Sequence, residues 1–213
     1  MNKRTTLPLL STLLALACAS AAEPPTDAAQ TAPLRAGDPV PSVTVRTAGG
    51  DEVSLRHLTA TQPTAIIFYR GGWCPYCTKH LMALAEIEDE LHGLGYLLLA
   101  ISPDRPEKAA ETASESPFRY RLLSDASASA ARAFGLAFRI DDETVEMYKS
   151  YGIDLEEASG ESHHLLPVPA VFLTGLDGTI AYAHADPDYK ERLDPAAILE
   201  AARAALLPAA DVE

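Results

Sequence analysis

Two cysteines separated by two residues, Cys74 and Cys77, are the side chains of this sequence best suited to chemistry. A disulfide between them would close a very small loop, so it would stabilise the chain little through entropy. The pair is therefore expected to work by being made and broken. One sulfur can attack an oxidised partner, and the other can resolve the mixed species.

The residues around the pair predict that it lies where a buried strand ends and a helix begins. A short apolar run, 65–69, precedes it, and apolar residues at spacings of three and four follow over 81–94, which predicts one helix. Pro75 suits the first turn of that helix. The N–H groups and dipole of such a turn favour a thiolate and lower its pKa by about one unit or more. Trp73 is expected to pack beside the sulfurs, and the glycines at 71–72 to let a partner's backbone approach.

A metal site is the alternative explanation for the cysteine pair. Structural zinc needs four ligands, and the chain has no second pair of this kind, although His80 is near. Copper could be held by the two sulfurs with a histidine from His163 or His164. The redox explanation accounts for the position of the pair before an amphipathic helix, so no metal or cofactor is expected. His163 and His164 are then expected to be loop residues.

The other elements follow from hydrophobic periodicity and turn residues. Strand, helix and strand over 65–101 form a βαβ unit, whose strands should be parallel. The further elements that the pattern predicts are a first strand at Val43 and Val45, a turn at 49–51 before Val53 and Leu55, a helix from Pro106, a strand at 120–123, a helix capped by Asp125 and stopped by Gly135, and a helix over 143–150 within a region, 136–166, otherwise expected as loops.

The chain is expected to finish with a hairpin and a helix. Strands at 171–174 and 179–183 flank Asp177-Gly178, which is a strong hairpin signal, and Asp194-Pro195 opens a final helix. The prediction is an α/β fold with a central mixed sheet, a βαβ unit, a C-terminal β-hairpin and a closing helix, which is the order of thioredoxin-like folds.

Pro169 stands immediately before the first strand of that hairpin, where a proline would interrupt a central ladder. A cis Val168–Pro169 bond would explain it and would leave the neighbouring backbone free to pair with a substrate chain. An ordinary turn proline, helped by Pro167, is the alternative.

The N-terminus resembles a secretory signal peptide. A basic start, a short apolar run and small residues ending at Ala22 predict cleavage there and export, with the periplasm as destination. Acylation at Cys18 is an alternative, but Ala15 stands where such sites usually carry Leu.

The rest of the chain divides into a flexible linker, one domain and a tail. The linker is expected over 23–39, the thioredoxin-like domain over 40–207 and the tail over 208–213. No second apolar run is long enough to span a membrane. The net charge of −13 argues against nucleic acid as a partner.

Five segments, in this order, resemble the alkyl hydroperoxide reductase/thiol-specific antioxidant (AhpC/TSA) family of peroxiredoxin-like proteins. They are FYRGGWCPYC, AISPD, LLSD followed by ARAFGL, LPVPAVFL and ADPDY, and the resemblance covers residues 37–206. It implies a thioredoxin-like fold and thiol-dependent reduction of peroxides or disulfides.

The sequence departs from that family at three positions. Cys77 aligns with the peroxidatic cysteine, whereas Cys74 occupies the place of a Thr or Ser and Arg70 that of a Pro. Pro169 stands where many peroxiredoxins have an Arg. Cys77 attacks first by this alignment, and Cys74 by a thioredoxin or glutaredoxin alignment.

The leading hypothesis is an exported dithiol oxidoreductase that reduces hydroperoxides and is recycled by an external dithiol. A thioredoxin-like reductase of protein disulfides is the alternative, and a copper-handling protein of the same fold is third. The catalytic residues are Cys74 and Cys77. The residues expected to shape the site are Arg70, Trp73, Pro75, Tyr76 and Pro169.

Overall fold

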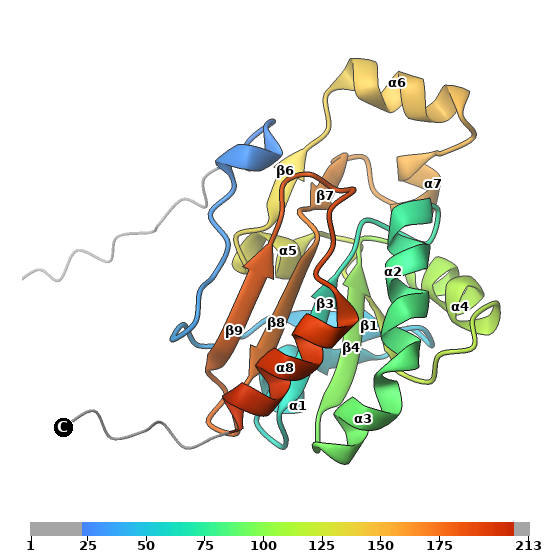
Figure 1. The fold of residues 1–213 in the computed structure, drawn as a ribbon. Coiled ribbons are helices and arrows are strands. Elements are labelled where there is room, and N and C mark those ends of the chain that lie inside the picture. Colours follow the sequence, from blue (N-terminus) through green and yellow to red (C-terminus); the bar gives the residue numbers. More distant parts are fainter. Residues whose placement is uncertain (1–22, 207–213) are drawn as a thin grey trace, which may run out of the picture.

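The computed structural model describes residues 23–206, which form a seven-stranded sheet between two layers of helices (Figure 1). The strand order is β2-β1-β5-β4-β3-β8-β9. These strands are β1 (Thr44–Thr47), β2 (Glu52–Ser54), β3 (Thr64–Phe68), β4 (Leu97–Ser102), β5 (Arg121–Ser124), β8 (Ala170–Thr174) and β9 (Ile180–Ala185). Strands β3, β4 and β5 run parallel, while β1, β8 and β9 join them by antiparallel pairing. The predicted α/β fold with a mixed sheet is confirmed.

Alternate residues of the central strands point to opposite helix layers. Ile67 of β3 belongs to a cluster with the cysteines and the helices on one face, whereas Ile66 and Phe68 belong to the cluster on the other. The first layer consists of α2 (Pro75–Glu86), α3 (Glu88–Gly93), α4 (Pro106–Ser114) and α8 (Pro195–Ala205). The second contains α1 (Leu55–Thr59) and α5 (Ser129–Ala133).

The predicted βαβ unit is present, with one correction. Strands β3 and β4 are parallel and are joined through helices, as expected. The single helix predicted over 81–94 is wrong, because the chain breaks at Ile87 (φ −104°, ψ 2°) into α2 and α3. The acidic residues Glu88, Asp89 and Glu90 then occupy the first turn of α3, where a helix dipole favours negative charge.

The hairpin and the final helix follow the prediction. Strands β8 and β9 pair antiparallel around the Asp177-Gly178 turn, in which Gly178 has φ +75°. The Asp194 side chain caps α8 by accepting a hydrogen bond from the Ala196 N–H, and Pro195 is the first residue of the helix.

Residues 136–166 were expected to form one helix and otherwise loops, which is wrong in part. The helix is α6 (Asp142–Ser150), but β6 (Ala137–Arg139) and β7 (Leu165–Pro167) also pair as a small second sheet, and α7 (Leu155–Ser159) lies between them. Strands of three residues carry too little periodicity to be recognised, and their pairing spans most of this region.

The segment predicted as a flexible linker, 23–39, lies against the domain. Its only helix among the described residues is a short 3-10 turn, η1 (Ala28–Gln30). The N–H groups of Ala32 and Leu34 donate to the carbonyls of Gly135 and Phe134, and Pro39 forms a bridge with Thr179. A chain held by backbone hydrogen bonds is part of the fold rather than a free leader.

The proposed signal peptide with Cys18, and the tail over 208–213, lie outside the described residues. Within 23–206, no helix combines the length and the apolar character that a membrane crossing would require.

Candidate active site

Cys74 and Cys77 occupy the first turn of α2, directly beyond the carboxyl end of β3. Cys74 is the N-cap residue in extended conformation (φ −91°, ψ 113°), and Pro75 follows as the first helical residue, as predicted. The Cys77 N–H donates to the Cys74 carbonyl over 3.0 Å. Both cysteines are free and buried, with exposures of 1% for Cys74 and 0% for Cys77. The reduced dithiol is therefore covered by its surroundings.

The two thiols have opposite electrostatic preferences. The pKa of Cys74 is lowered because the Cys77 thiol donates a hydrogen bond to its sulfur, and the Cys77 N–H and the cations Arg70 and Arg192 add to this effect. The pKa of Cys77 is raised, because it gives that hydrogen bond and because it is buried. Cys74 is therefore the sulfur at which a thiolate is favoured, and Cys77 is the one at which it is disfavoured.

Arg70, the residue before the two glycines, is buried among aromatic rings. Its guanidinium carbon lies 4.2 Å from the centre of the Tyr189 ring, 5.3 Å from that of Trp73 and 5.6 Å from that of Tyr148. It also donates a hydrogen bond to the Tyr148 hydroxyl. Cation–π contacts of this kind are worth more when they are shielded from water, so they hold a positive charge close to Cys74.

A second arginine, Arg192, contacts the other sulfur. It lies in the segment 186–193 between β9 and α8, and its Nη2 donates to Cys77 Sγ over 3.5 Å. The same segment carries Tyr189, whose ring meets that of Tyr76 edge to face with 5.6 Å between centres. We call residues 186–193 the closing segment, because its side chains contact Arg70, Tyr76 and Cys77.

The glycines before the cysteines are packed against the protein itself. Gly71 has φ +150°, and a Cβ there would lie 2.2 Å from Trp73 Nε1 and 2.8 Å from Asp104 Oδ1. A Cβ on Gly72 would lie 2.1 Å from Thr112 Oγ1. The absence of a side chain at both positions therefore serves packing within the protein, and the approach of a partner's backbone stays a prediction.

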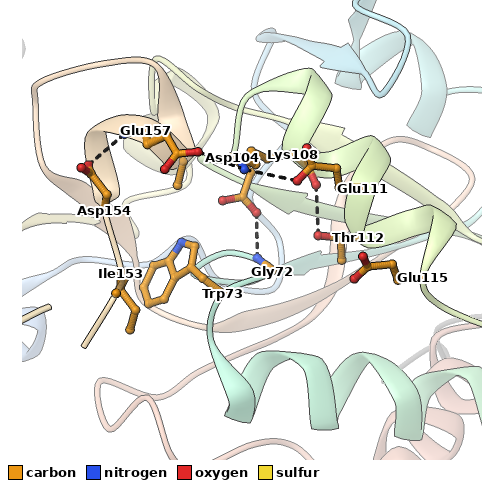
Figure 2. A pocket seen from close by; sticks show the side chains of 12 residues that line it. Gly72, Trp73, Asp104, Lys108, Glu111, Thr112, Glu115, Ile153, Asp154 and Glu157 are labelled. Atoms are coloured by element: carbon orange, nitrogen blue, oxygen red, sulfur yellow. Dashed lines mark hydrogen bonds and ion pairs between the residues drawn. The ribbon is translucent and has the colours of Figure 1, made fainter. Parts of the chain in front are cut away.

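Asp104, from the AISPD segment, is hydrogen-bonded to the loop that contains the two glycines. Its Oδ2 accepts hydrogen bonds from the Gly72 N–H (2.8 Å) and from the Ser102 hydroxyl (3.0 Å). Burial raises the pKa of Asp104 to about 6, although these hydrogen bonds and Lys108 act in the opposite direction. Asp104 also lines a cavity of about 260 Å³ beside Trp73 (Figure 2). The sequence did not indicate that Asp104 supports the loop before the cysteines.

Pro169 has a trans peptide bond, as do all the peptide bonds over 23–206, so the cis alternative is wrong. The backbone on either side of it is already paired. The Val168 N–H donates to the Leu136 carbonyl over 2.9 Å, and the Pro169 carbonyl accepts from the Asp186 N–H over 3.2 Å. These two backbone groups are therefore not free to pair with a substrate chain.

The remaining predicted residues fall into two groups. Trp73 packs against the cluster that contains both cysteines, as expected, and Tyr76 is 41% exposed next to them.

The two histidines of the proposed copper site are bonded elsewhere in the protein. His163 uses both ring nitrogens, one 2.7 Å from the Ala126 carbonyl and the other accepting from the Leu165 N–H. His164 pairs with Glu156 over 2.8 Å. Over residues 23–206, no three His, Cys, Asp or Glu side chains are arranged to hold a metal ion.

Comparison with known proteins gives a consistent result. The model of the AhpC/TSA family matches residues 36–183. The peroxiredoxin Bcp of Escherichia coli strain K12 is 33% identical over 104 residues, which are 49% of this chain and 66% of that protein. The match thus spans just under two thirds of the length of this relative.

Solved structures of similar shape support the predicted fold class. The peroxidoxin BcpB of Mycobacterium tuberculosis superposes with a TM-score of 0.62 at 23% identity, covering 80% of this chain and 97% of that one. The peroxiredoxin Q of Xanthomonas campestris gives 0.61 at 21% identity, covering 79% and 97%. These structures share the fold with this chain.

Proposed function

Because the chain belongs to the AhpC/TSA family, we propose that it is an exported dithiol peroxidase that reduces hydroperoxides through Cys74 and Cys77. An external dithiol returns it to the reduced state. The observation that carries the proposal is the geometry of the pair: two free cysteines lie in the first turn of α2, and Arg192 contacts one of the sulfurs. This arrangement supplies a nucleophile and a resolving thiol side by side.

The reaction begins with attack of the Cys74 thiolate on one peroxide oxygen. The O–O bond breaks, water or an alcohol leaves after taking up a proton, and Cys74 becomes a sulfenic acid. The Cys77 sulfur then attacks the Cys74 sulfur, a disulfide forms and water leaves. Two electrons have passed from the dithiol to the peroxide, and an external dithiol restores them by exchange.

The choice of Cys74 as the nucleophile follows from the pKa directions rather than from the family alignment, which favours Cys77. Cys74 is the N-cap residue, where the pKa is lowered, whereas Cys77 is the third residue of the helix and its pKa is raised. A sulfur that keeps its proton is a poor first nucleophile.

The alternative, a thioredoxin-like reductase of protein disulfides, is less well supported. A substrate chain would have to pair with the backbone beside Pro169, but the Val168 N–H and the Pro169 carbonyl already have partners within the protein. A small hydroperoxide needs no such pairing.

Stopped-flow oxidation tests the peroxidase activity. Trp73 is the only tryptophan of the chain and packs beside the cysteines, so its fluorescence reports on their oxidation. We expect hydrogen peroxide to oxidise the reduced protein faster than free cysteine, and Cys74→Ser to abolish this reaction. Cys77→Ser should still consume one equivalent of peroxide without forming a disulfide. A rate no greater than that of free cysteine would contradict the proposal.

Export is proposed from the sequence of residues 1–22 and is tested separately. When the full chain is produced in a Gram-negative host, the mature protein should begin at Glu23 and be found in the periplasmic fraction. A product that retains its original N-terminus in the cytoplasm would rule out cleavage, and a lipid-modified Cys18 would support the alternative anchor.

A further inference from the structure

We propose that Arg192 is a further catalytic group, which stabilises Cys77 as the leaving thiolate when an external dithiol opens the Cys74–Cys77 disulfide. This inference rests on the proposed dithiol chemistry. It concerns the recycling half of the cycle, however, and does not depend on which oxidant forms the disulfide.

Two hydrogen bonds to main-chain carbonyls hold the Arg192 guanidinium beside the Cys77 sulfur. One terminal nitrogen, Nη2, lies 3.5 Å from Cys77 Sγ. The other, Nη1, donates to the main-chain carbonyls of Tyr189 and Glu191, the latter over 2.7 Å. A planar guanidinium fixed through one nitrogen is preorganised to present the other to an anion.

The charge of Arg192 is not neutralised elsewhere in the described structure. All the ion pairs found over 23–206 involve other basic side chains. The Nε of Arg192 is buried and has no hydrogen-bond partner among these residues. A buried donor without a partner costs free energy, so its position needs a compensating role.

Cys77 is the sulfur whose thiolate needs a stabilising positive charge. Its side chain is fully buried, and burial disfavours a thiolate unless hydrogen bonds or a positive charge support it. The groups that favour the thiolate at Cys77 are the backbone N–H of Arg70 and the charge of Arg192. The Arg70 guanidinium is instead directed toward Tyr148 and stacked on Tyr189.

The chemical step places negative charge on this sulfur. A thiolate of the external dithiol attacks Cys74 Sγ, a bond forms between these sulfurs, and the Cys74–Cys77 bond breaks. The electron pair of the broken bond goes to Cys77 Sγ, beside the guanidinium. The second thiol of the reductant then displaces Cys74 and leaves as part of a disulfide. A lower pKa of the leaving thiol makes the first exchange faster.

Disulfide reduction measured apart from peroxide chemistry tests this role. The disulfide is formed with diamide in the wild type, Arg192→Met, Arg192→Lys and Lys190→Met, and its reduction by dithiothreitol is followed through Trp73 fluorescence. Loss of a charged hydrogen bond should slow reduction by about tenfold in Arg192→Met. Arg192→Lys should recover part of the rate. Lys190→Met removes a neighbouring charge of the same segment that lies 5.8 Å from the centre of the Tyr189 ring, and it should slow reduction much less than Arg192→Met does.

A second readout follows the sulfur itself. In a Cys74→Ser background, the pKa of Cys77 from the pH dependence of alkylation should rise when Arg192 is replaced by Met and less when it is replaced by Lys. Circular dichroism establishes that each variant is folded. The inference is wrong if Arg192→Met is reduced at the wild-type rate or faster, or if the Cys77 pKa is unchanged.

The outcome separates the two proposals. A wild-type protein that reacts slowly with peroxide, while its diamide-formed disulfide still depends on Arg192 for reduction, would remove the peroxidase activity and leave this inference standing. Rapid oxidation by peroxide, together with disulfide reduction at the same rate in wild type and Arg192→Met, would support the peroxidase activity and contradict the role of Arg192.

Discussion

The guanidinium carbon of Arg70 lies 4.2 Å from the centre of the Tyr189 ring, although the two residues are 119 positions apart in the chain. Through this contact the closing segment is joined to the loop that carries the cysteines. Tyr189 also meets the ring of Tyr76, and Arg192 of the same segment contacts Cys77. With both sulfurs nearly inaccessible, a reagent reaches Cys74 only when side chains of this region move.

Replacing Tyr189 by Ala should therefore make the dithiol easier to reach. The substitution removes the ring that packs on Arg70 and on Tyr76, so we expect alkylation of the reduced protein by iodoacetamide to become several-fold faster. Tyr151→Ala is the matched control, because Tyr151 is 72% exposed. Equal alkylation rates for wild type and Tyr189→Ala would show that this ring does not limit access.

The reactivity of Cys74 should depend on pH through the hydrogen bond from Cys77. The pKa of Cys74 is lowered to about 6, first because the Cys77 thiol donates to its sulfur. The thiolate therefore forms as pH rises through about 6, and the alkylation rate should increase over that range and level off near neutral pH. Mass spectrometry of the alkylated protein identifies the reacting sulfur.

Two substitutions at Cys77 separate this hydrogen bond from the remaining causes. Cys77→Ala removes the donor, so the midpoint of the Cys74 profile should move to higher pH. Cys77→Ser keeps a hydroxyl that can donate and should move it less. A midpoint that is the same in Cys77→Ala as in the wild type would mean that the helix terminus and the arginines alone lower this pKa.

Close packing at Gly72 should make that position intolerant of a side chain. A Cβ there would lie 2.1 Å from Thr112 Oγ1 and 3.3 Å from Thr112 Cβ. Gly72→Ala should lower the free energy of unfolding by about 1–3 kcal/mol, which is the usual cost of overpacking. Adding Thr112→Ala should recover part of this loss.

The control for this substitution is Gly93→Ala at the end of α3, where an added Cβ meets nothing within 4 Å. It should leave stability unchanged or slightly raised, since Ala favours the helix. Urea unfolding of the four proteins gives the comparison. Gly72→Ala with wild-type stability, or a double variant no more stable than Gly72→Ala, would contradict the packing explanation.

Much of this structure could be predicted from the sequence, because helix starts, turns and buried strands are determined by residues that are neighbours in the chain. Pro75 and Asp194 mark helix starts through fixed φ and side-chain capping, and Asp177-Gly178 marks the hairpin through a residue that accepts positive φ. The run over 65–69 indicates a buried strand whichever way it pairs. The cysteine pair could be proposed as the candidate site for the same reason, since its spacing within one helical turn is a local property.

The features that the sequence did not reveal depend on contacts between distant segments. Tyr148 comes from α6 and Arg192 from the closing segment, and only the folded chain brings them to Arg70 and to Cys77. The pairing of β6 with β7 and the occupation of the space at Gly72 by Thr112 are of the same kind. No periodicity or turn residue encodes such contacts, so pattern analysis could not place them.

The buried carboxyl of Asp104 should make stability depend on pH in a defined direction. Burial raises its pKa from 3.8 to about 6. The folded state therefore holds the proton more tightly than the unfolded state does, and the stability from protonation is complete below about pH 4 and lost as pH rises through about 6. This difference in pKa corresponds to about 3 kcal/mol between the two limits.

Asp104→Asn isolates this effect, because an amide oxygen can still accept from the Gly72 N–H without carrying charge. Relative to wild type, the variant should gain free energy of unfolding between pH 4 and pH 7, by up to about 3 kcal/mol. Asp125 is also buried with a pKa raised to about 6, but it is present in both proteins and cancels in the difference. Urea unfolding at several pH values provides the measurement. A constant difference between Asp104→Asn and wild type would mean that the carboxyl stays ionised in the folded protein throughout this range.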